Sequence, residues 1–312
     1  AGAELVNTFA IGKGATAILS QHIGDLKNAP TFEFYQESIG RFSSLFRFTP
    51  SLAACDLHPD YMSSAFAEKM NIPLEYVQHH HAHIAACMAE HKLDQKVIGI
   101  AFDGTGLGDD GTIWGGEFFV CDLSGYERKY YFDPVPLPGG DRVSDEPWRT
   151  AVSYLYKYLG TNVFDQELAF LKDIPKENIR LLLQAVDKGI NCPLSAGAGR
   201  LFDAVAALTG ICTHSSFHAE APMRLEAAIA HGCKSKYLFD VEENRITFMK
   251  LFYLILKDLR EGIAAEVISA KFHNTMLAVM LSVSKKLKAE TGINTVVLSG
   301  GSFQNRYLLE NA

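Results

Sequence analysis

Residues 78–114 read QHHHAHIAACMAEHKLDQKVIGIAFDGTGLGDDGTIW, and the rest of the chain is organised around them. If the segment after Val77 is helical, His79 and His83 stand one turn apart on one face, where two imidazoles can bind a single cation. The apolar run KVIGIAF predicts a buried strand that ends at Asp103. A carboxylate at a strand end, followed by glycines, favours a metal beside phosphate oxygens. Half-buried helix histidines and an ordinary hairpin loop are the alternatives.

The composition is that of a globular protein. Of the 312 residues, 48% are hydrophobic and 21% are charged, and a chain of this length is expected to form two domains or lobes. The net charge of −7 and the lack of a basic tract disfavour nucleic acid as the main partner. Six widely spaced cysteines without a CxxC pair fit a reducing cytoplasm. Neither a membrane span nor a signal peptide is evident, so we expect no membrane association.

The segment before residue 78 predicts alternating strands and helices. Residues 4–21 favour a hairpin with Gly12 to Gly14 at its tip, which either embraces a phosphate or is an ordinary surface hairpin. SLAACDL and LEYVQH are predicted strands on either side of a helix over DYMSSAFAEKM. This alternation is typical of an α/β sheet with its site at the carboxyl edge. A helix over 33–48 is expected to bury Phe34, Phe42, Leu45 and Phe46.

The segment after the glycine turn predicts two antiparallel strands, GGEFFVCDL and ERKYYFDPVPL, followed by mainly helical sequence. The Pro- and Gly-rich residues 134–141 suggest a lobe boundary. We therefore expect a first lobe over 1–133, with the histidine helix and the DGTG turn, and a second lobe over 134–312. The helices expected in the second lobe cover EPWRTAVSYLYKYLG, 164–190, the segment after SAGAG, HAEAPMRLEAAIAHG and 262–289.

Two segments of the second lobe suggest a nucleotide. Asp203 follows Gly199 by one helical turn and can reach a ribose hydroxyl, although it can also be a solvated surface acid. The strand TVVLS ends at Gly300 and Gly301, with Asn305 at the start of a helix, which predicts a second nucleotide edge. Two glycine turns at two strand ends imply a cleft between two lobes. The last stretch, VVLSGGSFQNRYLLENA, stops within a predicted helix, so we expect the chain to be a fragment of a larger protein.

Motifs spread over the whole chain resemble those of one family. They are SQHIGDL, CDLHPDY, the histidine helix, FDGTGLGDDGTIWGGEF, LPGGD, GRLFDAVAALTG and LSGGSFQNRYLLE. The set resembles the hydrogenase maturation carbamoyltransferases of the HypF type, in their threonylcarbamoyl-transferase-like domain. The resemblance implies the two-lobed α/β fold of actin, the heat-shock chaperone ATPases and the sugar kinases, with a nucleotide and metal cleft between the lobes.

The resemblance also implies the roles of individual residues. His79, His83 and Asp103 would bind one divalent ion, with Fe, Zn, Mn and Mg not distinguished. A further metal-binding aspartate of the family would lie beyond Ala312. In FHAEAPM (217–223), His218 and Glu220 stand where the family usually has Glu and Gln, as in EGQAAM, so the role of this stretch is open. The implied nucleotide-binding residues are Gly104, Thr105 and Gly106 at the phosphates, Gly199 and Asp203 at the ribose, and Gly300, Gly301 and Asn305 at the base and sugar.

The reaction implied by the resemblance has two steps. Carbamoyl phosphate and ATP form carbamoyl-adenylate in another domain, and this domain transfers the carbamoyl group to the C-terminal cysteine of a partner hydrogenase maturation protein. The product leads to the cyanide ligand of nickel-iron hydrogenase. The bound metal would act as a Lewis acid, without a covalent nucleophile from the chain. Open alternatives are O-carbamoyl or threonylcarbamoyl transfer to another acceptor, and a non-catalytic nucleotide-binding scaffold.

Overall fold

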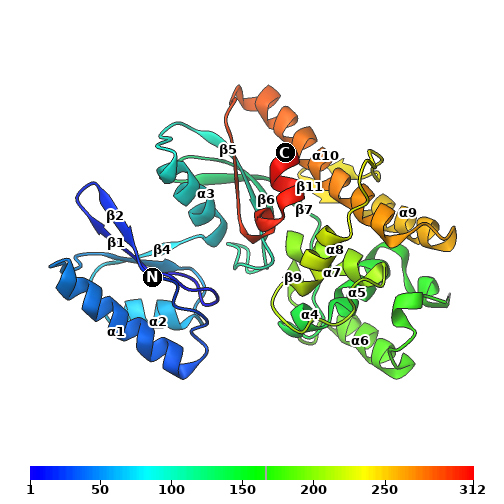
Figure 1. The fold of residues 1–312 in the computed structure, drawn as a ribbon, viewed down its shortest axis with the longest axis horizontal. Coiled ribbons are helices and arrows are strands. Elements are labelled where there is room, and N and C mark those ends of the chain that lie inside the picture. The colour runs from blue at the N-terminus through cyan, green and yellow to red at the C-terminus, as the bar shows by residue number, and fades with distance from the viewer. Residues whose placement is uncertain (166) are drawn as a thin grey trace. The chain divides into compact units, whose positions relative to one another are not determined.

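The structure, a computed structural model, describes residues 1–165 and 167–312 (Figure 1). It divides into two compact units, Ala1–Ala82 and His83–Ala312. The lobe boundary expected between residues 133 and 134 does not coincide with this division. It lies inside the second unit, between β7 (Tyr126–Phe132) and β8 (Val135–Pro136), and stays a prediction.

The first unit combines a hairpin with a βαβ segment. The expected hairpin is antiparallel and pairs Lys13 with Thr16, so its turn consists of Gly14 and Ala15, and Gly12 lies within the first strand. β3 and β4 are parallel and align Asp56 with Val77, which brings the end of β3 close to the start of the histidine helix. The elements are β1 (Ala10–Lys13), β2 (Thr16–Leu19), α1 (Ala29–Leu45), β3 (Ala53–Asp56), α2 (Met62–Glu68) and β4 (Leu74–Val77).

Helix α1 buries a different stripe from the expected one. Phe34 is 40% exposed and Leu45 is 73% exposed, so these two members of the predicted stripe were assigned wrongly. Tyr35 is buried instead and packs edge-to-face on Phe9, with ring centroids 5.9 Å apart. Phenylalanines occur on more than one face of this helix, and composition alone could not select the buried face.

The second unit is built on a six-stranded sheet with the order β10-β11-β7-β6-β5-β12 (Figure 1). β5, β6 and β7 are antiparallel neighbours, as expected, whereas β12 joins β5 in parallel and aligns Ser299 with Ala101. The glycine turns after β5 and β12 therefore leave the same edge of one sheet. The two turns thus belong to one sheet, and their assignment to two lobes stays a prediction together with the lobe boundary. The new strands are β5 (Val97–Phe102), β6 (Gly116–Cys121), β10 (Asp240–Glu242), β11 (Arg245–Thr247) and β12 (Val296–Ser299).

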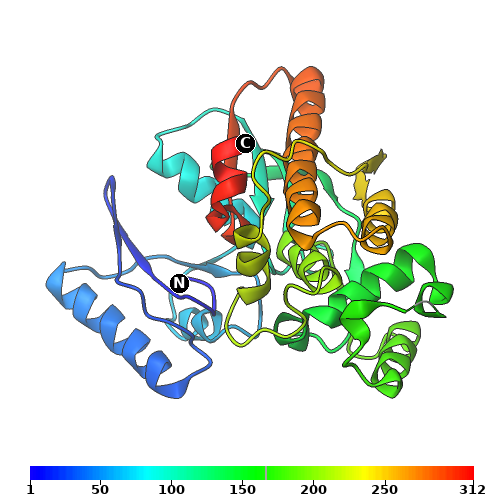
Figure 2. The same cartoon turned by 45° about the vertical axis from the view of Figure 1, so that its right-hand side comes forward.

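Side chains of β5 are buried on both faces of the sheet. Ile98, Ile100 and Phe102 belong to the large core with residues of α10 (Ala265–Thr291), which runs along the sheet (Figure 2). The opposite face, with Val97 and Ala101, packs against α3 (His79–Glu90). The sheet therefore fixes the position of the histidine helix.

The remaining helices complete the core of the second unit. α5 has Pro147 in its first turn and ends at Gly160, as expected. The helical sequence expected over 164–190 is only partly helical. It contains the end of the 3-10 helix η1 (Thr161–Asp165), the 3-10 helix η2 (Ala169–Leu171) and the regular helix α6 (Lys176–Lys188), which starts directly after Pro175; residue 166 lies outside the described residues. The elements are α4 (Arg142–Asp145), α5 (Pro147–Leu159), η1 (Thr161–Asp165), η2 (Ala169–Leu171), α6 (Lys176–Lys188), β9 (Leu194–Ser195), α7 (Ala198–Leu208), α8 (Glu220–Ala227), α9 (Met249–Arg260), η3 (Gly301–Gln304) and α11 (Arg306–Asn311). Among the described helices, none is both long enough and apolar enough to cross a membrane.

Candidate metal and nucleotide site

Helix α3 carries both histidines of the candidate metal site. His79 and His83 both lie on α3, one turn apart, and the division between the two units falls between Ala82 and His83. Ile84 and Met88 are fully buried against the sheet. Their packing sets the rotation of α3 and thus the direction of both imidazoles.

Asp56 fixes the orientation of His79. Its Oδ2 atom lies 2.7 Å from His79 Nδ1. Burial raises the pKa of Asp56, but the hydrogen bonds from His79 and from the His58 amide outweigh burial and hold the pKa below its usual value. The ionised carboxylate therefore accepts a hydrogen bond from Nδ1–H, and a metal ion bound by His79 would take Nε2. Asp56 was not expected at the site, although it ends a predicted strand and a site was expected at the carboxyl edge of the sheet.

Asp103 follows β5 directly and is held by backbone contacts. Its N–H donates to the Gly115 carbonyl at 2.8 Å, and its Oδ1 accepts from the Gly104 N–H at 2.7 Å. Its Oδ2 lies 3.0 Å from His83 Nε2. Gly115 has a φ of +142°, and a Cβ there would lie 2.6 Å from the Asp103 carbonyl oxygen. Only glycine fits at that position, and it allows the loop to hold the carboxylate against α3.

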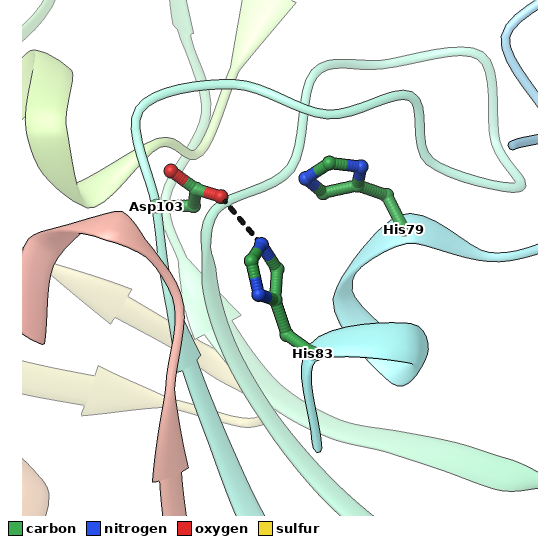
Figure 3. A group of neighbouring side chains, drawn as sticks. All are labelled: His79, His83 and Asp103. Atoms are coloured by element: carbon green, nitrogen blue, oxygen red, sulfur yellow. Dashed lines mark hydrogen bonds and ion pairs between the residues drawn. The ribbon is translucent and has the colours of Figure 1, made fainter. Parts of the chain in front are cut away.

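The side chains of His79, His83 and Asp103 meet in one cluster (Figure 3). One ligand atom from each residue lies within 4.8 Å of the others. Two imidazole nitrogens and a carboxylate oxygen are a donor set that suits divalent transition metals. The carboxylate of Asp56 behind His79 is the kind of supporting contact that metal-binding histidines usually have. These residues therefore fit a divalent ion.

The two glycine turns and the start of α7 converge beside this cluster. The Gly199 N–H donates to the Asp103 carbonyl at 3.0 Å, and a Cβ on Gly199 would lie 2.8 Å from Gly104 Cα. Gly300 has a φ of +104°, and its Cβ would lie 2.4 Å from a carbonyl oxygen of β5. A Cβ on Gly301 would lie 2.9 Å from Asp103 Oδ1. Four of the predicted nucleotide-binding glycines thus come together, and bare backbone is needed where these segments meet.

The other two residues predicted at the phosphates differ in exposure. Thr105 is exposed, whereas Gly106 is buried. The Gly106 carbonyl accepts a hydrogen bond from the Trp114 N–H at 2.9 Å. Thr105 can therefore face a ligand, while Gly106 contributes to the shape of the loop.

Asp203 is buried, so its interpretation as a solvated surface acid is wrong. The residue is 2% exposed, and its Oδ2 lies 2.9 Å from Arg200 Nη1. Burial raises the pKa of Asp203 to about 6, although the charge of Arg200 opposes the shift. Arg200 was not expected at the site, because nothing in the sequence indicates that its guanidinium adjoins the turn after β5. The ribose contact of Asp203 stays a prediction.

Asn305 is anchored inside the fold. Its Oδ1 accepts from the Leu308 N–H at 2.9 Å and caps α11, and its Nδ2 lies 3.0 Å from His273 Nε2. Burial lowers the pKa of His273 to about 4, against the opposing effect of its hydrogen bond to the Ser269 carbonyl. The neutral imidazole donates from Nδ1 to that carbonyl at 2.8 Å and accepts from Asn305 at Nε2. Asn305 thus positions the segment after Gly301, and its contact with a base or sugar stays a prediction.

A buried ion pair contacts the backbone at the end of the loop that follows Asp103. Glu117 is fully buried, and its Oε2 lies 2.7 Å from Arg128 Nε. Its Oε1 accepts from the Gly115 N–H at 3.2 Å. The Arg128 guanidinium also lies 3.9 Å from the centroid of the Trp114 ring and 3.0 Å from Asp110. Burial raises the pKa of Glu117, and Arg128 counteracts part of this effect.

The FHAEAPM stretch forms the entry to α8. Ala219 has a φ of +60°, a conformation that favours glycine. The EGQAAM motif, which FHAEAPM resembles, has glycine at this position. Glu220 accepts from the Ser216 N–H at 2.6 Å and lies 2.8 Å from the Ser216 hydroxyl oxygen. The Ser216 amide contributes most to holding the pKa of Glu220 below its usual value. Glu220 therefore closes the turn that starts the helix.

Comparison with known proteins assigns the family. Residues 1–90 match the family model of the HypF Kae1-like domain, and residues 99–312 match that of the carbamoyltransferase Kae1-like domain, second subdomain. Carbamoyltransferase HypF of Synechocystis is 35% identical over 99% of this chain and 42% of its own length. A carbamoyltransferase HypF homolog of Cupriavidus necator is 32% identical over 98% of this chain and 81% of its own.

A solved structure agrees with these matches. The crystal structure of full-length HypF in a phosphate- and nucleotide-bound form has a TM-score of 0.93 and 42% identity, over 99% of this chain and 48% of that one. The chain thus spans less than half the length of this protein and of the Synechocystis relative. The match confirms the expected fold class, the two-lobed α/β class of actin. By both family models, the chain belongs to the HypF carbamoyltransferase family, in which it corresponds to the Kae1-like domain.

Proposed function

We propose that this chain is the carbamoyl-transferring domain of a hydrogenase maturation enzyme. Carbamoyl-adenylate would form from ATP and carbamoyl phosphate in a part of the protein outside this chain. The acceptor would be the C-terminal cysteine of a partner maturation protein. The observation that carries the proposal is the placement of three metal donors, His79, His83 and Asp103, directly beside the glycine turns of a carbamoyltransferase-family chain.

The proposed transfer replaces one acyl bond by another. The thiolate sulfur of the acceptor attacks the carbamoyl carbon, a C–S bond forms, and the C–O bond to the AMP phosphate breaks. AMP leaves with the electron pair, so negative charge grows on its phosphate oxygens. His79 Nε2, His83 Nε2 and Asp103 Oδ2 would hold a divalent ion, which supplies Lewis-acid stabilisation of that charge.

The nucleotide would lie along the converging glycines. In this proposal Gly104 and Thr105 face the phosphates, with Gly106 shaping the turn. Gly199 and Asp203 face the ribose, and Gly300, Gly301 and Asn305 face the base and sugar. The close backbone approaches at these glycines support the placement, because a ligand can reach main-chain atoms only where side chains are absent. All six cysteines are free thiols, which supports a reducing compartment, and we propose the cytoplasm.

The test uses the full-length protein with labelled carbamoyl phosphate, ATP and the partner protein. His79→Ala and His83→Ala should abolish metal-dependent transfer, while His91→Ala, an exposed histidine just after α3, should keep the wild-type rate. Wild-type rates in both metal-site variants would end the proposal. Transfer to labelled tRNA or to a small molecule in place of the partner would favour the sibling reactions. Nucleotide binding without turnover would favour a scaffold.

A further inference from the structure

We propose that Arg200 is the cation that binds the nucleotide phosphate in this site, and that Asp203 positions it. The inference rests on the proposed nucleotide site and adds to it a residue and a division of roles. Its starting observation is the position of the guanidinium. A Cβ on Gly104 would lie 3.3 Å from Arg200 Nη2, so the charged group adjoins the turn after β5.

The turn itself offers little positive charge to a phosphate. The Gly104 N–H already donates to Asp103 Oδ1 at 2.7 Å. The remaining donors of the turn, such as the Thr105 hydroxyl, are neutral, so a phosphate beside it needs a cation from elsewhere. A guanidinium meets that need, because its planar donors match two phosphate oxygens at once.

Two neighbouring side chains hold the Arg200 guanidinium in place. Nη1 donates to Ser144 Oγ of α4 at 2.7 Å and lies 2.9 Å from Asp203 Oδ2. Both contacts use Nη1, whereas the atom nearest Gly104 is Nη2. The guanidinium is thus fixed at one nitrogen and directs another toward the glycine turn.

The Arg200 side chain also has unused donor capacity. It is 12% exposed. Within the part of the chain that the structure describes, its Nε is buried and has no hydrogen-bond partner. Buried donors of this kind are uncommon in folded proteins, and a ligand oxygen is one way to satisfy them.

Asp203 acts on the phosphate through Arg200. Its side chain is 3% exposed and supplies the buried counter-charge for the guanidinium. The ribose contact proposed above would use the other oxygen, Oδ1. The two roles of Asp203 are therefore separable with ligands that lack either the phosphate or the ribose.

The experiment is calorimetric titration of the full-length protein with AMP, adenosine and inorganic phosphate. Arg200→Gln should weaken AMP binding by about 10- to 100-fold and leave adenosine binding unchanged. Arg200→Lys should lie between Arg200→Gln and the wild type. Arg142→Gln removes an exposed arginine of α4 and should change neither ligand. The double variant Arg200→Gln/Asp203→Asn avoids an unpaired buried carboxylate. If the single variant unfolds, the double variant should still lose affinity for inorganic phosphate, a ligand that a ribose contact does not affect.

Asp203→Asn separates positioning from ribose binding. If Asp203 holds Arg200, this variant weakens inorganic phosphate binding, which a ribose contact alone would leave unchanged. Unchanged AMP affinity in Arg200→Gln, unchanged phosphate affinity in the double variant, or equal loss of AMP and adenosine in Arg200→Gln would overturn the inference while the nucleotide site stands. A wild-type protein that binds neither AMP nor adenosine would overturn the nucleotide site as well.

Discussion

Replacing Arg128 by Met should destabilise the second unit by about 3–5 kcal/mol at pH near 8, because Glu117 would keep a buried charge without its partner. Glu117 is fully buried and loses the 2.7 Å contact with Arg128 Nε, while Met still fills the space over Trp114. In a unit of this size each kcal/mol corresponds to roughly 2–4 °C, so the midpoint of thermal unfolding should fall by about 6–20 °C.

The penalty should depend on pH in a defined direction. Burial raises the pKa of Glu117 in the folded protein, and Arg128 opposes that rise. Without Arg128 the folded variant holds a proton on Glu117 at pH values where the unfolded chain has released it. Stability of the variant therefore increases as pH falls, and most of the penalty should be lost near pH 5.

Thermal and urea unfolding followed by circular dichroism at both pH values measures these effects. The variant Glu117→Gln/Arg128→Met removes the buried charge but keeps the oxygen that faces Gly115, so it should be more stable than Arg128→Met at the higher pH. Lys129→Met is the control, because it removes the cation next to Arg128 in β7. Its partner Glu127 is mostly exposed, so this variant should change stability by less than about 0.5 kcal/mol. A loss below about 1 kcal/mol for Arg128→Met at the higher pH would refute the reasoning.

Three further outcomes are expected. Asp56→Asn should weaken divalent-metal binding by about 10- to 100-fold in a metal titration, because His79 loses the carboxylate that orients it. Ala219→Gly should stabilise the protein by roughly 1 kcal/mol in urea unfolding, because φ is +60° there, whereas Ala227→Gly in the same helix should destabilise it. The pKa of His273 is lowered to about 4 by burial, so the unfolded chain takes up the proton first as pH falls. Stability should therefore drop by on the order of 1–3 kcal/mol from about pH 7 to 4, and His273→Gln should flatten this dependence.

Much of the fold could be predicted, because strand and helix signals are local. The apolar run of β5 is buried on both faces, and Pro147 and Gly160 mark the ends of α5. The helix expected over 164–190 was confirmed only in part, because the regular helix α6 begins after Pro175 and the residues before it form a 3-10 turn at Ala169–Leu171. The parallel pairing of β12 with β5 could not be predicted, because it joins segments from opposite ends of the second unit.

The candidate site was predictable only in part. Residues within one motif, such as His79 and His83, stand out by their spacing along the sequence. Asp56 and Arg200 were missed because their importance arises from contacts with residues far away in the chain. Asp203 was located correctly on its helix, but its burial depends on packing that the local sequence does not encode.

The pairing of β12 with β5 has a consequence for folding kinetics. Val296 aligns with Ile98, so almost the whole second unit must be synthesised before these strands can meet. Contacts this distant in sequence close slowly, since the loop entropy is lost before the pairing compensates for it. We therefore expect the segment with Gly300 and Gly301 to dock after the turn at Asp103 has formed. The proposed nucleotide site would then be completed only at the end of folding, and a ligand that contacts both turns would stabilise the product of that last step.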